Sequence, residues 1–112
     1  MPKQDYYKPG QLTDTAFITL AALTEPRHGY KIMHEVEAQT NGEINLGPAS
    51  LYTTLRKLAE AGLIALISEE DNKKVYQATE SGLEALRLEV NKRRKLADYG
   101  EQAINNYTGE QQ

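Results

Sequence analysis

Apolar residues recur at helical spacing in three short segments of the first half of the chain. The segments run from about residue 12 to 24, from 29 to 40 and from 48 to 61. In each, apolar positions lie three or four residues apart, which places them on one face of a helix. These positions are Leu12, Ala16, Leu20 and Leu23, then Ile32, Met33 and Val36, then Leu51, Leu55 and Leu58. The pattern predicts three short helices around a common core.

Helix-breaking residues separate the three segments. Pro26 ends the first, since proline disfavours a helical conformation in the residue before it. Asn41 and Gly42 end the second, because either residue can adopt the left-handed cap conformation. Gly47 and Pro48 open the third, where proline suits the first helical position. The helix boundaries are therefore predicted independently of the apolar spacing.

The pattern changes after residue 62. Residues 63–68 form an apolar, β-prone run, and residues 73–77 can return beside it as a second strand. Asp71 and Asn72 lie between the two runs and are typical turn residues. This part of the sequence predicts a β-hairpin.

A long helix is expected over residues 80–108, capped by Thr79. Its apolar stripe, interrupted by Gly100 and by the basic run 92–95, consists of Leu83, Leu86, Val90, Leu96, Tyr99, Ile104 and Tyr107. A helix of about 28 residues is about 42 Å long, which exceeds the width of a small domain. A symmetric partner is the simplest cover for its far half. We therefore expect these residues to form a homodimer interface.

The order helix, helix, helix, hairpin, long helix is the outline of a winged helix-turn-helix domain followed by a dimerisation helix. The expected fold class is mainly α with a β-hairpin wing (α+β). We expect a flexible N-terminal arm at residues 1–10, the winged helix-turn-helix domain at 11–79, the dimerisation helix at 80–108 and a disordered tail at 109–112.

Composition excludes several classes of protein. The chain has 112 residues, no cysteine and two histidines, so disulfides and thiolate metal sites are excluded and a histidine-rich metal site is not expected. No catalytic motif or Gly-rich phosphate loop is present. His28 is expected to cap the second helix rather than to serve as a catalytic base or metal ligand. We predict no enzyme activity, no metal and no cofactor. Without a signal peptide or a membrane span, we expect a cytoplasmic protein associated with the nucleoid.

The formal net charge of −3 argues mildly against nucleic acid, because binding to the phosphate backbone depends on Lys and Arg. The positions of the charges matter more than their sum. The third helix carries a polar side, at or beside the face opposite its leucines, made of Ser50, Tyr52, Thr53, Thr54, Arg56 and Lys57. Hydroxyls can bond phosphates or base edges, and arginine can pair with guanine. An ordinary solvated helix face has the same composition, so this segment alone does not decide.

Several short motifs, in this order and spacing, resemble the PadR family of transcriptional regulators from about Leu12 to Tyr107. They are His28-Gly29-Tyr30, Gly47-Pro48 with Ser50-Leu51-Tyr52, Leu58, Gly62-Leu63-Ile64, Tyr76 and Thr79-Glu80-Ser81-Gly82. The resemblance implies a dimeric repressor with a winged-helix domain, whose binding to double-stranded DNA at a palindromic operator is relieved by a ligand.

Combined with the polar side of the third helix, the resemblance gives a set of expected DNA-binding residues. They are Gly29, Tyr30, Lys31, Ser50, Tyr52, Thr53, Thr54, Arg56, Lys57, Lys73 and Lys74. The last two lie at the tip of the hairpin, where a wing needs cations to hold phosphate.

Two features depart from the family's pattern. In the family the wing often carries a run of arginines, whereas here it has Lys73 and Lys74 beside the acidic run 69–71. The last helix has Arg93 where drug-sensing members have tryptophan, so we expect an anionic or polar small-molecule effector between the protomers, or none. A winged-helix module that binds only proteins is the alternative function, and the acidic balance favours it.

Overall fold

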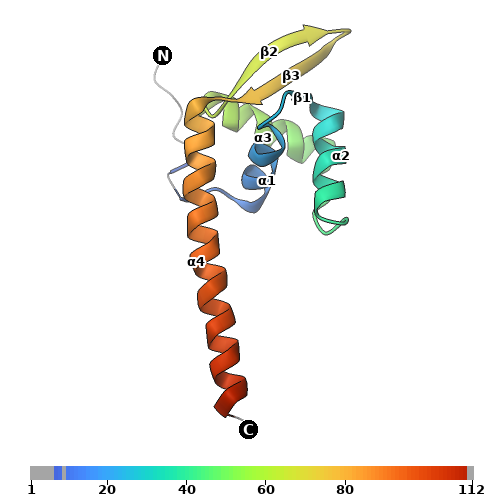
Figure 1. Cartoon of the computed structure of the whole chain (residues 1–112). Coiled ribbons are helices and arrows are strands. Elements are labelled where there is room, and N and C mark those ends of the chain that lie inside the picture. Colours follow the sequence, from blue (N-terminus) through green and yellow to red (C-terminus); the bar gives the residue numbers. More distant parts are fainter. Residues whose placement is uncertain (1–6, 9, 111–112) are drawn as a thin grey trace.

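The computed structural model describes residues 7, 8 and 10–110. The element order is α1 (Asp14–Ala22), β1 (Arg27–His28), α2 (Gly29–Gln39), α3 (Pro48–Glu60), β2 (Ile64–Glu70), β3 (Lys73–Ala78) and α4 (Glu80–Glu110). Figure 1 shows a small body made of the first three helices and the sheet, with α4 extending away from it. This arrangement confirms the expected winged-helix, α+β fold class.

The predicted helix boundaries hold to within one or two residues, and their caps can be seen. The Thr13 hydroxyl accepts a hydrogen bond from the Ala16 backbone N–H at 3.1 Å and so caps α1. Asn41 and Gly42 both have positive φ, at 52° and 81°, after the end of α2. The Thr79 hydroxyl accepts from the Gly82 N–H at 3.1 Å and caps α4 as predicted.

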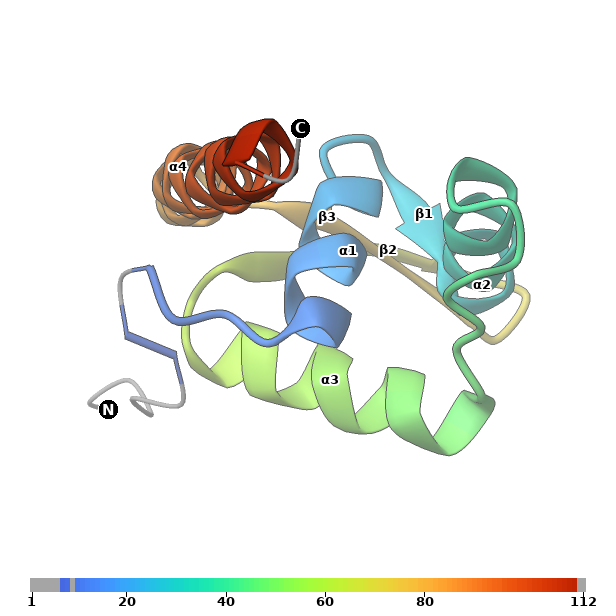
Figure 2. The same ribbon diagram turned by 90° about the horizontal axis from the view of Figure 1, so that it is seen from below.

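The core lies where α1 crosses between the other helices. Figure 2 shows α1 between α2 and α4, with α3 passing beneath it. Leu20 of α1 and Leu23, which follows that helix, are fully buried against Ile32 of α2 and Leu51 and Leu58 of α3. All five were predicted as apolar positions of the three helices, and their burial fixes which side of α3 faces outward.

The sheet contains one strand that the sequence pattern did not predict. The two-residue strand β1 pairs with β3, with Arg27 opposite Tyr76 and His28 opposite Val75, so that the strand order is β1-β3-β2. A strand of two residues is too short to show any alternation. Its pairing ties the start of α2 to the hairpin.

Helix α4 approaches the body very closely at its first turn. A Cβ built on Gly82 would lie 2.0 Å from the Leu63 carbonyl oxygen. The same segment is held by the Thr79 backbone N–H, which donates to the Leu63 carbonyl at 3.0 Å, and by the Thr79 hydroxyl, which donates to the Gly62 carbonyl at 2.7 Å. The helix continues to Glu110, past the boundary expected at 108. Only residues 111 and 112 of the expected tail lie outside the described part of the chain.

The expected flexible arm differs from the structure in its last part. Residues 1–6 and 9 lie outside the described residues, but Tyr7 is half-buried against the core, and burial raises the pKa of its phenol. The Gly10 carbonyl accepts a hydrogen bond from the Lys92 ammonium. Lys92, in the basic run of α4, therefore contacts the N-terminal segment.

Candidate nucleic-acid interface

Helix α3 presents a polar surface because its leucines are buried. With Leu51, Leu55 and Leu58 in the core, Ser50, Tyr52, Thr53 and Arg56 are exposed. Lys57 is half-buried. The Arg56 guanidinium lies 3.2 Å from the Glu60 carboxylate one turn later in the same helix. An exposed pair of this kind contributes only about 0.2–0.5 kcal/mol, so a stronger acceptor can displace the carboxylate.

Thr54 differs from its expected place. It is buried, and its hydroxyl donates to the Ser50 carbonyl at 2.9 Å within the same helix. At 100° per residue, Thr54 lies about 40° from Leu58 and about 60° from Leu51, so it falls at the edge of the apolar face of the helix. Thr54 therefore stabilises α3 and does not belong to its outward surface.

Gly29 and Tyr52 meet where the start of α2 approaches α3. A Cβ at Gly29 would lie 3.2 Å from the Tyr52 hydroxyl oxygen and 3.5 Å from the Leu51 side chain. The glycine leaves room for the phenol of Tyr52 to lie over the start of α2. Tyr30, the next residue, is 62% exposed, and its ring packs on His34 with the ring centroids 5.0 Å apart. Lys31 is exposed beside it.

The hairpin has the geometry expected of a wing. Asp71 and Asn72 have positive φ, at 51° and 63°, which suits the tight turn of a two-residue hairpin loop. Lys73 and Lys74 follow at the tip and are exposed. Their Cα partners on β2 are Glu70 and Glu69 respectively, so acidic groups stand directly across the ladder from both lysines. This register weakens the positive potential of the wing tip.

A groove of ≈ 480 Å³ brings five of the predicted residues together. Gly29, Tyr30, Tyr52, Lys73 and Lys74 line it, from α2, α3 and the wing.

Four other lining residues were missed as members of this surface, namely His28, Leu55, Asn72 and Tyr76. His28 is the N-cap residue of α2, as predicted, but its side chain makes no capping hydrogen bond. The pairing of β1 with β3 places His28 beside the hairpin. Only that tertiary contact reveals its membership, because nothing local in the sequence does.

The apolar stripe of α4 divides into two parts. Leu86 packs against the protomer's own core, which differs from the expected role at a dimer interface, and Leu83 is half-buried. The distal residues Leu96, Tyr99, Ile104 and Tyr107 are 60–72% exposed, and Val90 between the two parts is 37% exposed. The stripe therefore serves the protomer's core in its first turns and offers an aromatic, apolar surface farther on.

Arg93 has partners within the protomer. Its guanidinium donates to Glu89, Asp14 and the Leu12 carbonyl. The expectation that Arg93 meets an anionic effector is therefore not supported by its position. Across the described residues, no helix is long and apolar enough to cross a membrane, and no group of three or more His, Cys, Asp or Glu side chains could hold a metal ion.

Comparisons with known proteins agree with this geometry. The family model described as "Transcriptional regulator PadR-like family" matches residues 19–88. The "Transcriptional regulator YqjI" of Escherichia coli K12 is 37% identical over 59 residues, which cover 53% of this chain and 28% of that protein's length.

Two solved structures of PadR family regulators are similar over most of the chain. The one from Eggerthella lenta DSM 2243 has 27% identity and a TM-score of 0.66, and the match covers 79% of this chain and 75% of that one. The one from Clostridium difficile R20291 has 17% identity and a TM-score of 0.70, and the match covers 82% and 99% of the two chains. At 17% identity the second likeness shows the fold alone.

Proposed function

Given that this chain belongs to the PadR-like family of transcriptional regulators, we propose that it is a homodimeric repressor that binds a palindromic operator in double-stranded DNA. The family consists of regulators of transcription rather than enzymes. The observation that carries the proposal is the groove in which the start of α2, the exposed side of α3 and the wing meet. We place this regulator on the chromosome, in the cytoplasm.

Helix α3 supplies the base contacts in this proposal. Thr53 and Arg56 are exposed on the side opposite Leu51 and Leu58. Arginine forms a two-pronged hydrogen bond with guanine that is worth about 1–3 kcal/mol of discrimination between bases. That exceeds the few tenths of a kcal/mol held in the exposed pair with Glu60. Binding to the operator therefore exchanges the intrahelical partner of Arg56 for a base. Ser50 and Lys57 flank the same side.

The groove residues supply phosphate contacts that position the protein without reading sequence. Tyr30 and Tyr52 line the groove with exposed phenol side chains, and Lys73 and Lys74 line it from the wing. Lys31 adds a cation one residue beyond Tyr30. Because Glu69 and Glu70 lie across from the wing lysines, most of the affinity comes from α3 and α2.

The distal half of α4 holds the two protomers together. Leu96, Tyr99, Ile104 and Tyr107 are large, exposed side chains on a helix that extends away from the body (Figure 1). Their burial against a second copy, together with Val90 and Leu83, would remove this surface from water. A two-fold dimer then presents two α3 helices to half-sites about one helical turn apart.

We propose a small-molecule effector site between the protomers, where the exposed tyrosines Tyr99 and Tyr107 provide flat surfaces for a ligand. A ligand bound there would relieve repression only through its different affinity for the DNA-binding and the free arrangement of the dimer.

Binding of the full chain to the duplex upstream of its own gene tests the proposal, with a scrambled duplex of the same composition as the control. A series of salt concentrations separates sequence-specific binding from non-specific binding. We expect specific binding to a palindromic segment, and a dimer in sedimentation equilibrium. Equal, weak binding to both duplexes would contradict the proposal and favour a winged-helix module that binds only proteins.

A further inference from the structure

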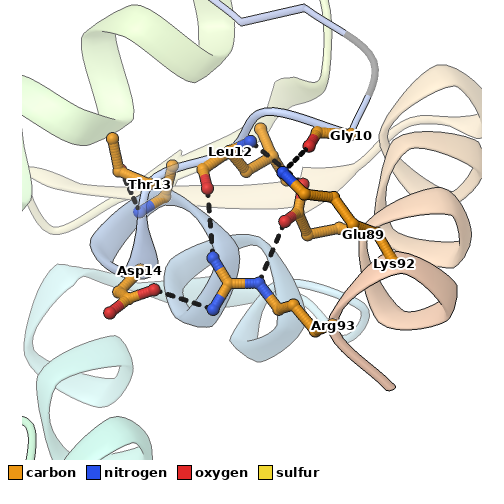
Figure 3. A network of polar contacts seen from close by, with 8 residues as sticks. Gly10, Leu12, Thr13, Asp14, Glu89, Lys92 and Arg93 are labelled. Atoms are coloured by element: carbon orange, nitrogen blue, oxygen red, sulfur yellow. Dashed lines mark hydrogen bonds and ion pairs between the residues drawn. The ribbon is translucent and has the colours of Figure 1, made fainter. Parts of the chain in front are cut away.

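Residues of α4 hold the N-terminal segment through an ion pair between the buried Glu89 and the partly exposed Arg93, drawn in Figure 3. The Glu89 side chain is 1% exposed. One of its carboxylate oxygens accepts from the Leu12 backbone N–H at 3.0 Å, and the other accepts from the Arg93 Nε at 3.0 Å. The Arg93 Nη2 donates to the Leu12 carbonyl at 3.0 Å. Glu89 and Arg93 thus hold both backbone polar groups of one residue.

Two further contacts fix the Arg93 side chain. Its Nη1 donates to the Asp14 carboxylate at 2.7 Å, and its guanidinium lies 4.4 Å from the centre of the Phe17 ring. Burial by itself lowers the pKa of Arg93, but the hydrogen bonds and charges of Asp14 and Glu89 outweigh it and raise that pKa. The Arg93 guanidinium therefore stays charged, and each of its three nitrogens donates one hydrogen bond. We call Glu89, Arg93 and the Leu12 backbone the clasp.

The clasp lies where α4 leaves the body. Before it, Gly82 and Leu86 pack on the body, whereas the side chains after it, from Arg94 to Tyr99, are exposed. A buried ion pair is a poor source of stability, but one with several directional bonds selects a single geometry. Among the contacts printed between α4 and the body for the described residues, those of Arg93 lie farthest along the helix, so the clasp bears on the direction of the half of α4 beyond it.

We infer that the clasp is a positioning device that sets the direction of α4, and through it the separation of the two recognition helices in the dimer. This inference rests on the proposed function. The 18 residues from Arg93 to Glu110 span about 26 Å, so a tilt of about 10° displaces the end of α4 by about 4–5 Å. That exceeds the rise of one base pair, about 3.4 Å. Without the clasp, the separation of the two recognition helices would vary, and the dimer would no longer select one spacing of half-sites.

The test combines two measurements on Arg93→Met and the milder Arg93→Lys, with Arg94→Met and Arg94→Lys as matched controls one residue along. Lysine keeps the charge but lacks the planar fork that reaches several acceptors. The first measurement is the distance distribution between spin labels at Ala49→Cys and Gln102→Cys of one chain, diluted with unlabelled protein. Because the chain has no cysteine of its own, these are the only labelled sites, and the distance reports α4's direction whether or not a dimer forms.

The second measurement is the affinity for duplexes in which the two half-sites are moved apart or together by single base pairs. In the first measurement, the distribution of label distances should be about twice as wide in Arg93→Met as in the wild type. It should widen less in Arg93→Lys and should not change in either Arg94 variant. The wild type should prefer one separation by about tenfold, the effect of one mismatched base pair. Arg93→Met should lose most of that preference and should still form dimers.

Each outcome decides something different. A distribution as narrow in both Arg93 variants as in the wild type would overturn the clasp as a positioning device, whatever the DNA shows. A wider distribution with an unchanged spacing preference would overturn its role in setting the separation. If the wild type binds no two-half-site duplex, the proposed function fails, and the label distances still show whether the clasp directs α4.

Discussion

Replacing Gly82 with alanine should weaken the attachment of α4 to the body. The added carbon would lie 2.0 Å from the Leu63 carbonyl oxygen and 3.3 Å from the Leu20 side chain, where ordinary contacts begin at 3.4 Å. The oxygen is part of the backbone and accepts the Thr79 N–H at 3.0 Å, so it cannot turn away. The helix must move outward by about 1 Å or more, or the strand must shift.

The free energies can be compared directly. Alanine gains up to about 1 kcal/mol over glycine in a helix. Overpacking a well-filled site costs about 1–3 kcal/mol, and losing the Thr79 hydrogen bond costs about 0.5–1.5 kcal/mol more. The net loss in the free energy of unfolding is therefore about 0.5–3.5 kcal/mol, which lowers the Tm by about 4–8 °C for each kcal/mol in a domain of this size.

Urea unfolding of Gly82→Ala beside Gly100→Ala measures this difference. Gly100 lies in the same helix, and nothing lies within 4 Å of a Cβ built on it. Within a single protomer, where Gly100 meets no other atom, the same substitution should add about 0.5–1 kcal/mol through helix propensity, so both variants are compared at a concentration that keeps the chain monomeric. If both variants were equally stable, or Gly82→Ala were the more stable, the close approach of α4 to Leu63 would not constrain the fold as argued.

Three further predictions concern the wing, the distal half of α4 and two buried threonines. Replacing Lys73 and Lys74 together by alanine should weaken binding to all DNA sequences and make the log–log salt slope shallower by roughly two units; an unchanged slope would place the wing tip off the DNA. Ending the chain after Lys95 keeps the clasp and removes Leu96, Tyr99, Ile104 and Tyr107, so sedimentation equilibrium should show a folded monomer, and a persisting dimer would place the interface elsewhere. Thr19→Val should raise the free energy of unfolding by about 1 kcal/mol, because the buried Thr19 hydroxyl has no hydrogen-bond partner among the described residues. Thr54→Val removes the bond to the Ser50 carbonyl and should lower the free energy of unfolding.

Local signals were sufficient for most of the fold. The apolar spacing of α1, α2 and α3 and the residues that break them depend only on neighbours in the chain, and the predicted caps at Thr79 and Asn41-Gly42 are present. Thr54 was misplaced because a helical projection gives an angle but not the width of the buried face. Burial at that edge depends on which neighbours pack there.

Tertiary contacts explain what the sequence could not show. Strand β1 exists because Arg27 and His28 meet β3, about 47 residues later in the chain. The clasp joins residues 77 to 81 positions apart, and no periodicity links Leu12 with Arg93. The basic run 92–95, which interrupts the apolar stripe, therefore also supplies Arg93 to the buried carboxylate of Glu89.

The central claim, that α3 reads base sequence, is tested most directly by Arg56→Ala measured beside Arg87→Ala. The two arginines are matched, since each is exposed and paired within its own helix, Arg56 with Glu60 at 3.2 Å and Arg87 with Glu84 at 3.4 Å. The affinities for the operator and for a scrambled duplex are measured at one salt concentration. We expect Arg56→Ala to lose about 1–3 kcal/mol on the operator and much less on the scrambled duplex, while Arg87→Ala binds both as the wild type does. Operator affinity unchanged in Arg56→Ala, or lowered equally in both variants, would contradict the account.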